Sequence, residues 1–289
     1  MLRAFQSGPI SKQEIDARWA RATLNDEHKT SIPKSTFYHM KNEVEELFNV
    51  DIEVNENGEF YVVESASMDK DFHQWLLSGL AIGNTLNECE NIHSRIMYEK
   101  IPGGTQYLHT IADAMQNNCR VIIRYGSFKH EPREFIFSPY AIRVYKQRWY
   151  AIGHSSDHPD DVARVYAFDR FMQVSLTSAH FTVPANFSVE KFFHDCYGVT
   201  PGKPEDVVDV TVRIAHDGVQ YLRTLPLHHS QREVNTTPEY SDFQFHLAPN
   251  FEFTQEILSR GAEAEVLAPE SYRQQIAQTI AALNAKYNH

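Results

Sequence analysis

The spacing of apolar residues in the first 64 positions predicts two helices followed by a β-hairpin. In the first helix Ile15, Trp19 and Ala22 fall on one face, and Ser11 is placed as its N-cap with Glu14 three residues on. The second helix carries a helical stripe made by Phe37, Met40, Val44, Leu47 and Phe48. The strands DIEV and EFYVV then flank an Asn-Glu-Asn-Gly turn. Helix, gap, helix and hairpin are the plan of a winged helix-turn-helix over residues 1–64.

Residues 65–118 return to helical spacing. FHQWLLSGLAIGNTL has an apolar face, and TQYLHTIADAMQNN predicts another helix after the Pro-Gly-Gly break at 102–104. The segment is short for a domain, so we interpret it as a helical connector.

Residues 119–199 change to the alternating pattern of strands. CRVIIRYG, REFIFSPYAIRVY, RWYAIG and ARVYAFDRFMQVSLT are rich in β-formers and are joined by short turns, which favours a small antiparallel barrel. Residues 206–289 then follow a βαββαβ order with a final helix, typical of a small α+β module with its helices on one sheet face. The chain is therefore expected to be an α+β multidomain protein.

Composition narrows the class of protein. The 289 residues suit two or three domains, and 42% hydrophobic residues suffice for real cores. No apolar run approaches the ~18 residues of a membrane span. MLRAFQSGPIS lacks the apolar region of a secretion signal. Three scattered cysteines (Cys89, Cys119, Cys196) form no disulfide framework, which favours reduced thiols and a cytoplasmic location.

The charge is unevenly distributed. A net charge of −11 argues against non-specific wrapping of duplex DNA, which depends on neutralising phosphates. Between Cys119 and Arg170, however, nine Lys and Arg face six Asp and Glu. A basic island in an acidic chain predicts a site for an anion.

Residues 119–199, which include this island, resemble the WYL domain, a small Sm-like barrel named for a Trp-Tyr-Leu triplet. The matching features, in the expected order, are Ile123, Tyr125, Arg133, Pro139-Tyr140, Arg148-Trp149-Tyr150, Gly153, Arg164, Asp169-Arg170, Phe181, Pro184, Phe192-Phe193 and Cys196-Tyr197-Gly198. The sequence departs from the pattern where Ala151 replaces leucine and Phe171 replaces isoleucine, and both keep an apolar side chain.

The resemblance extends to bacterial transcription regulators, in which a winged helix precedes the WYL domain and a C-terminal extension follows it. It implies an operator-binding homodimer whose barrel senses a nucleotide or single-stranded nucleic acid. Such regulators have a full helix before the one that Ser11 caps. Here MLRAFQSG provides about two turns at best, so we expect either a truncated first helix or a start upstream of Met1.

Strand alternation predicts where the cations of the island point. It places Arg164, Tyr166, Phe168 and Arg170 on one face, and Arg148 with Tyr150 opposite Trp149 and Ala151. Arginine suits a nucleotide because its fork binds phosphate and its plane stacks on bases, and tyrosines add stacking. The expected ligand-binding residues are Arg133, Arg148, Arg164, Arg170, Tyr125, Tyr150 and His154. The alternative is that some of these arginines only pair with nearby acids at the sheet surface.

The second N-terminal helix is expected to read DNA. The polar residues of its first half lie off the apolar stripe, where a recognition helix meets bases and phosphates, and they are Lys34, Ser35, Thr36, Tyr38, His39, Lys41 and Asn42. Residues 1–64 carry seven Lys and Arg against twelve Asp and Glu, so a solvated acidic face remains the alternative.

No catalytic or metal motif accompanies these features. The His154/His158 spacing falls in a turn-rich stretch without a helix to align the pair, and His194-Asp195-Cys196 has no readable oxyanion hole. No P-loop, GxGxxG or GxSxG occurs. We expect no enzyme, cofactor or metal, and a ligand-responsive transcription regulator. The alternatives are a ligand-binding accessory protein without DNA reading and a nuclease, against which the lack of a Mg²⁺-type carboxylate cluster argues.

Overall fold

The structure is a computed structural model of the whole chain. It describes residues 8–21, 25, 30–48, 50–63, 75–76, 78–79, 82–83, 94–97, 99–100, 102–128, 131–158, 160 and 162–288. The chain divides into two compact units, Met1–Glu99 and Lys100–His289.

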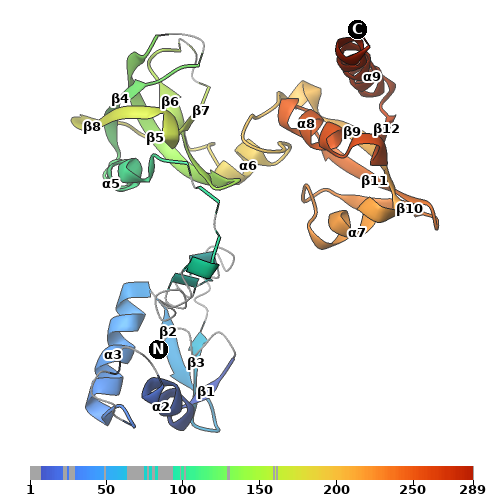
Figure 1. Cartoon of the computed structure of the whole chain (residues 1–289). Helices are drawn as coiled ribbons and strands as arrows, with labels where there is room; N and C mark the ends of the chain where they lie inside the picture. The colour runs from blue at the N-terminus through green and yellow to red at the C-terminus, as the bar shows by residue number, and fades with distance from the viewer. Residues whose placement is uncertain are drawn as a thin grey trace. The chain divides into compact units, whose positions relative to one another are not determined.

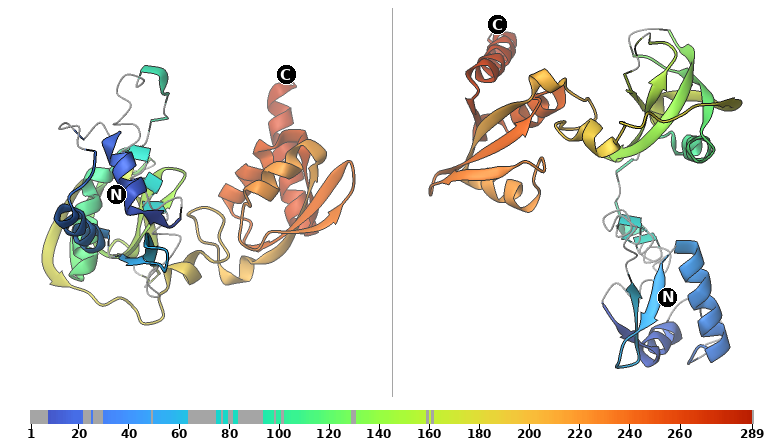
Figure 2. Two further views of the ribbon diagram at one scale, coloured as in Figure 1. Left: turned by 90° about the horizontal axis from the view of Figure 1, so that it is seen from below. Right: turned by 180° about the vertical axis from the view of Figure 1, so that it is seen from behind.

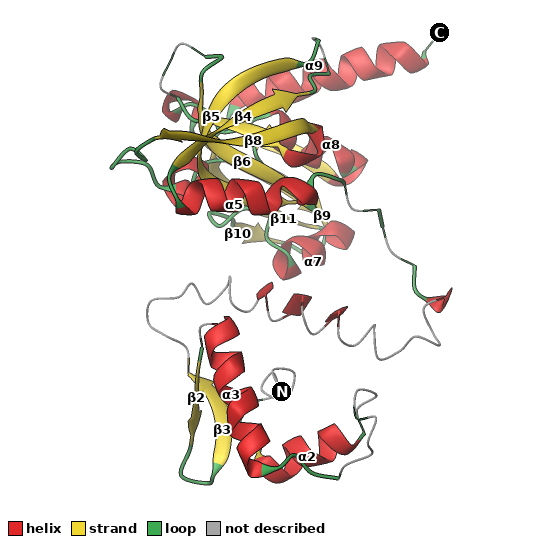
Figure 3. Ribbon diagram, turned by 90° about the vertical axis from the view of Figure 1, so that its left-hand side faces the viewer, coloured by secondary structure: helices red, strands yellow, loops and turns green. Residues whose placement is uncertain are grey.

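Among the described residues of the first unit, two longer helices pack beside a small antiparallel sheet (Figure 3). Its elements are β1 (Ile10–Ser11), α2 (Lys12–Ala20), α3 (Lys34–Phe48), β2 (Asp51–Val54) and β3 (Glu59–Val63). The strands lie in the order β1-β3-β2, so the predicted hairpin β2–β3 gains a short third strand. The core is made by Ile10, Ile15, Ile32, Phe37, Ile52 and Phe60.

The predicted N-cap of α2 is confirmed, because Ser11 Oγ accepts a hydrogen bond from the Glu14 amide at 3.2 Å. Phe37 is buried as the helical stripe predicts, and Met40 and Val44 pack against the same core. Several expectations lie outside the described residues: the shortened first helix at 1–7, Ala22, Cys89, and most of the connector from 64 to 93.

The second unit begins with a helix and a five-stranded antiparallel sheet (Figure 1). Its elements are η2 (Thr105–Tyr107), α5 (Leu108–Gln116), β4 (Cys119–Tyr125), β5 (Arg133–Tyr145), β6 (Arg148–Ser155), β7 (Arg164–Ala167), η3 (Phe168–Arg170) and β8 (Phe171–His180). The order β7-β6-β5-β4-β8 is antiparallel throughout. Ile111 and Ala114 of α5 are buried among Val121, Ile123 and Phe137, so the helix covers the core of the sheet.

The expected strand alternation holds on β6 but not across residues 164–170. Trp149 and Ala151 face the sheet core, opposite Tyr150, as predicted. Tyr166 and Phe168 are also buried in that core, but η3 interrupts the strand at Phe168. The prediction that Arg170 shares the face of Phe168 is therefore wrong, because a turn of 3-10 helix does not keep the two-residue period of a strand.

A linking segment and a second sheet complete the unit (Figure 2). They comprise α6 (Val189–Phe193), η4 (Pro204–Asp206), β9 (Val208–Ala215), α7 (His216–Thr224), β10 (Arg232–Thr236), β11 (Tyr240–Leu247), α8 (Phe251–Ser259), η5 (Gly261–Glu263), β12 (Ala264–Ala268) and α9 (Glu270–Tyr287). The strand order is β10-β11-β9-β12. Alternate strand residues such as Val212 and Phe245 pack with residues of α7, α8 and α9, which is the one-sided helix layer that the sequence predicts.

Candidate ligand-binding cleft

A cleft of about 850 Å³ opens between the five-stranded sheet and the segment that leads to the C-terminal sheet. The wall on the side of the five-stranded sheet is formed by Tyr125, Tyr150, Arg164, Val165, Ala167, Arg170 and neighbouring residues of the β6–β7 loop. Its other wall is formed by Lys191, Phe192, Asp195, Cys196, Val199, Thr200, Pro201, Gly202, Lys203, Pro204 and Val207. A cavity of this size is in the range that holds a small-molecule ligand.

Arg170 places a positive charge on the wall formed by the five-stranded sheet. Its Nε donates to the carbonyl of Gly126 at 2.9 Å, and its guanidinium lies 4.6 Å from the ring centre of Tyr125 and 4.1 Å from that of Phe128. Within the part of the chain that the structure describes, no carboxylate forms an ion pair with Arg170. One hydrogen bond and two ring faces orient the guanidinium, which keeps its other donors for an anion.

Burial raises the pKa of Tyr125, whose hydroxyl accepts from the Ala167 amide at 3.4 Å. Burial likewise raises the pKa of Tyr150 on the same wall. Both tyrosines are therefore neutral at physiological pH and present ring faces and hydroxyls, without adding negative charge to the cleft.

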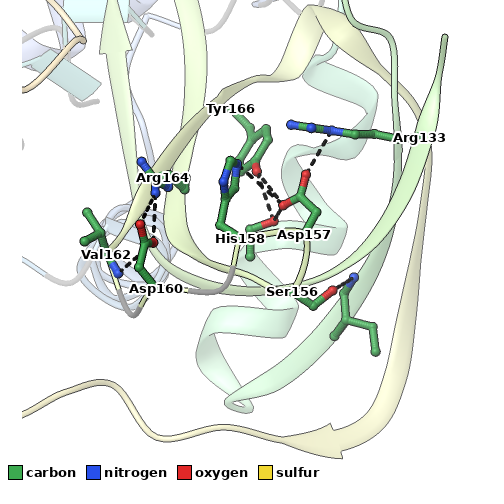
Figure 4. A network of polar contacts seen from close by, with 10 residues as sticks. Arg133, Ser156, Asp157, His158, Asp160, Val162, Arg164 and Tyr166 are labelled. Carbon is green, nitrogen blue, oxygen red and sulfur yellow. Dashed lines mark hydrogen bonds and ion pairs between the residues drawn. The ribbon is translucent and has the colours of Figure 1, made fainter. Parts of the chain in front are cut away.

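The remaining cations of the cleft differ in their pairing. Arg164 donates to both oxygens of Asp160, at 2.8 and 2.6 Å, so its charge is already matched (Figure 4). Lys203 lies 3.8 Å from Glu205, an exposed and weak contact. Lys191 is exposed and, among the described residues, forms no ion pair. Arg170 and Lys191 are thus the best placed to receive an anionic group.

Four of the seven ligand-binding residues expected from sequence line this cleft, namely Tyr125, Tyr150, Arg164 and Arg170. The other three do not. Arg133 pairs with Asp157 at 2.9 Å, as Figure 4 shows, and Arg148 lies 3.6 Å from Asp169. His154 is half-buried on β6, in register with Ser138.

Arg133 does not line the cleft because it forms an ion pair with Asp157. The Asp157 carboxylate also accepts from the hydroxyls of Ser155 and Tyr166, and this network fixes the start of the β6–β7 loop. Burial raises the pKa of Tyr166 to about 12. Arg133 neutralises a half-buried acid here, which is a structural use of its charge.

Family models match both parts of the second unit. The model of the WYL domain matches residues 106–176, and that of the WCX domain matches residues 206–283. The chain carries a WYL domain followed by a WCX domain. Neither model extends to the first unit.

Several solved structures are similar to the chain, among them the two that follow. Proteasome accessory factor B/C (PafBC) of Arthrobacter aurescens is 14% identical, with a TM-score of 0.35, over 95% of this chain and 44% of that one. A CRISPR Cas-related protein is 11% identical, with a TM-score of 0.45, over 99% of this chain and 85% of that one. This chain thus spans less than half the length of PafBC. Comparison with curated proteins returned no match.

Sequence reasoning missed the wall that lies beyond the WYL domain model. Lys191, Phe192 and Lys203 line the cleft, although only Phe192 belongs to the pattern that carries the resemblance. The lysines after residue 190 can be identified in the sequence, but nothing in their spacing indicates that they lie across a cleft from the five-stranded sheet.

The expected DNA-binding residues all lie on α3, where six of the seven are exposed: Lys34, Ser35, Thr36, Tyr38, His39 and Asn42. Lys41 differs. Its Nζ donates to Glu45 at 2.6 Å, and the same Glu45 oxygen accepts from the Ile52 amide at 2.7 Å. Lys41 therefore helps to join α3 to β2, and its charge is matched within the unit.

The described residues contain no group of His, Cys, Asp and Glu arranged to hold a metal ion. Cys119 and Cys196 are buried free thiols, and burial raises the pKa of Cys196 to about 12. None of the described helices is long and apolar enough to cross a membrane.

Proposed function

We propose that the protein is a DNA-binding transcription regulator whose WYL domain binds an anionic nucleotide or a short single-stranded nucleic acid in the cleft. The observation that carries the proposal is Arg170, an oriented guanidinium without an acidic partner among the described residues, set in a ligand-sized cleft. We propose a binding function for this site and no catalytic one.

The chemistry of the cleft favours a ligand with both a phosphate and a base. Arg170 and Lys191 offer charge to a phosphate, and Tyr150 and Phe192 offer ring surface to a base. Asp160 already occupies Arg164, so a phosphate that binds Arg164 has to compete with this carboxylate. The site therefore favours an anionic ligand over an uncharged aromatic compound.

We infer the DNA-reading role from the first unit together with the domain pair. The exposed polar face of α3 and the β2–β3 hairpin are compatible with a winged helix-turn-helix, and in the regulators that the chain resembles such a unit precedes a WYL domain. In this proposal the protein acts as a homodimer, and the ligand shifts the population between two spacings of the α3 helices.

A binding measurement tests the ligand site. Fluorescence anisotropy with a labelled hexanucleotide of single-stranded DNA should give saturable binding that inorganic phosphate and nucleoside monophosphates compete away. Arg170→Ala should weaken it roughly tenfold to a hundredfold, the usual loss for a charged hydrogen bond. Arg124→Ala removes the same charge from an exposed site outside the cleft and should stay within about twofold. Equal losses in the two variants would assign the binding to general charge.

A second measurement separates the regulator from its alternative. The acidity of residues 1–64 favours a ligand-binding accessory protein that does not read DNA. An electrophoretic shift at low salt with the protein's own upstream region should show retardation that the hexanucleotide alters. Hexanucleotide binding without any retardation would support the accessory protein instead.

A further inference from the structure

The loop Cys196–Thr200, which forms part of the cleft wall, is held by the first turn of α8 in the WCX domain. Asn250 Nδ2 donates to the carbonyls of Tyr197 and Thr200 at 2.7 and 2.8 Å. Glu252 Oε2 accepts from the amides of Val199 and Thr200 at 3.0 and 2.8 Å. Two side chains thus satisfy four backbone groups of one short loop.

The backbone of this loop fits closely against α8. Gly198 has a φ of +83°, and a Cβ at this position would lie 2.6 Å from the Glu252 carboxyl carbon. Cys196 forms a parallel bridge with Ala248, just before α8, and its thiol donates to the Thr200 carbonyl at 3.1 Å. The path of the loop is therefore set by the WCX domain.

Helix α8 also binds the β5–β6 turn of the WYL domain. Tyr197 Oη donates to Glu256 Oε2 at 2.7 Å, and Lys146 of the β5–β6 turn reaches this oxygen at 3.4 Å. The ring of Tyr145 packs edge-on against Tyr197. One helix therefore holds both the loop that forms one wall and a hairpin of the barrel that forms the other.

We propose that α8 is the element through which the WCX domain senses whether the cleft is occupied, with Asn250 and Glu252 as positioning residues that do not touch the ligand. This inference rests on the proposed ligand site. A ligand that spans Arg170 and the Cys196–Thr200 loop binds tightly only when α8 holds the loop in place. By linkage, the bound ligand then strengthens the attachment of the loop to α8 by the same factor.

Asn250 allows a sharp test, because its two side-chain atoms do different work. Oδ1 caps α8 by accepting from the Phe253 amide at 2.9 Å, whereas Nδ2 makes the two bonds to the loop. Asn250→Asp keeps the cap and places an acceptor against two carbonyls. Asn250→Ser also keeps a capping oxygen and removes the Nδ2 group that makes both bonds to the loop, without adding charge. Asn284→Asp, at an exposed position of α9, adds the same negative charge elsewhere.

The readouts are the anisotropy of the labelled hexanucleotide and hydrogen exchange of a peptide covering residues 196–204, both on the full chain. Asn250→Asp and Asn250→Ser should weaken hexanucleotide binding roughly fivefold or more, and Asn284→Asp should not. In the unsubstituted protein the bound hexanucleotide should slow exchange of this peptide, and both Asn250 variants should reduce that protection.

Unchanged affinity in both Asn250 variants, or no protection of the peptide on binding, would overturn the inference and leave the ligand site standing. Should Asn250→Asp fail to fold, Asn250→Ser carries the same decision. Absence of any hexanucleotide binding to the unsubstituted protein would overturn the proposed ligand site and this inference together.

Discussion

Three arginines that the sequence predicts to bind the ligand have different surroundings in the structure. Arg133 is held by Asp157, Arg148 lies near Asp169, and Arg170 stacks on aromatic rings with no acid pairing it among the described residues. A guanidinium that already has a carboxylate gains less from a phosphate, because it must first give up its partner. Each cation's neighbours therefore decide its role in binding.

At the residue scale, Gly198→Ala should destabilise the protein. The substitution places an L side chain at a φ of +83° and pushes its Cβ against a carboxylate that two amides hold in place. The backbone strain alone costs about 1–2 kcal/mol. Urea unfolding followed by circular dichroism should show the loss, and an unchanged midpoint would contradict the fit between the loop and α8.

Among the elements, a buried histidine joins the end of α6 to the turn after α7. His228 Nε2 donates to the His194 carbonyl at 2.9 Å, and Nδ1 accepts from the Ser230 hydroxyl at 2.7 Å. The His229 ring packs against both His228 and His194, and Asp195 binds His194 on its far side. Burial, with a contribution from His229, lowers the pKa of His228 to about 4.

This histidine predicts a loss of stability in acid. The unfolded chain takes up a proton near pH 6.5 and the folded protein only near pH 4, so the contribution is complete above pH 6.5 and is lost as the pH falls through this window. The shift corresponds to roughly 3 kcal/mol. His228→Gln should lower the free energy of unfolding at pH 7 and flatten its decline between pH 6.5 and 4 in urea titrations. Parallel pH profiles for the two proteins would rule this out.

Helix α3 carries a prediction for DNA binding. Lys34 is exposed at its first turn, and removing one phosphate-binding cation weakens binding to all sequences and lowers the salt slope of log affinity by about one. Lys34→Ala should show this in electrophoretic shifts at several salt concentrations, whereas Lys286→Ala at the end of α9 should not. An unchanged slope would take Lys34 out of the interface.

For the whole molecule, the division into two compact units has a consequence for mutants. Phe37 is 1% exposed and packs its ring 4.9 Å from that of Phe60 in the core of the first unit. Phe37→Ala should cost about 3–5 kcal/mol there. It should abolish DNA retardation and leave hexanucleotide binding within about twofold. A matching loss of hexanucleotide affinity would show that the cleft depends on the first unit.

From the amino-acid pattern alone, most of the described helices and strands could be predicted, together with part of one cleft wall. The spacing of apolar residues predicts α3, the β2–β3 hairpin and the strands of the five-stranded sheet. It does so because local spacing decides which face of an element can be buried. The residue pattern also pointed to Tyr125, Tyr150, Arg164 and Arg170, which do come together.

Two features could be found only from the folded protein: which cations have no acidic partner among the described residues, and which residues form the second wall of the cleft. Asp157 lies 24 positions after Arg133, and Asn250 lies 53 positions after Tyr197. Such contacts depend on how sheets and loops pack, and neither the composition nor the spacing of apolar residues predicts them. Side-chain alternation failed between Phe168 and Arg170 for a related reason, since a short 3-10 turn formed where the strand pattern continued in the sequence.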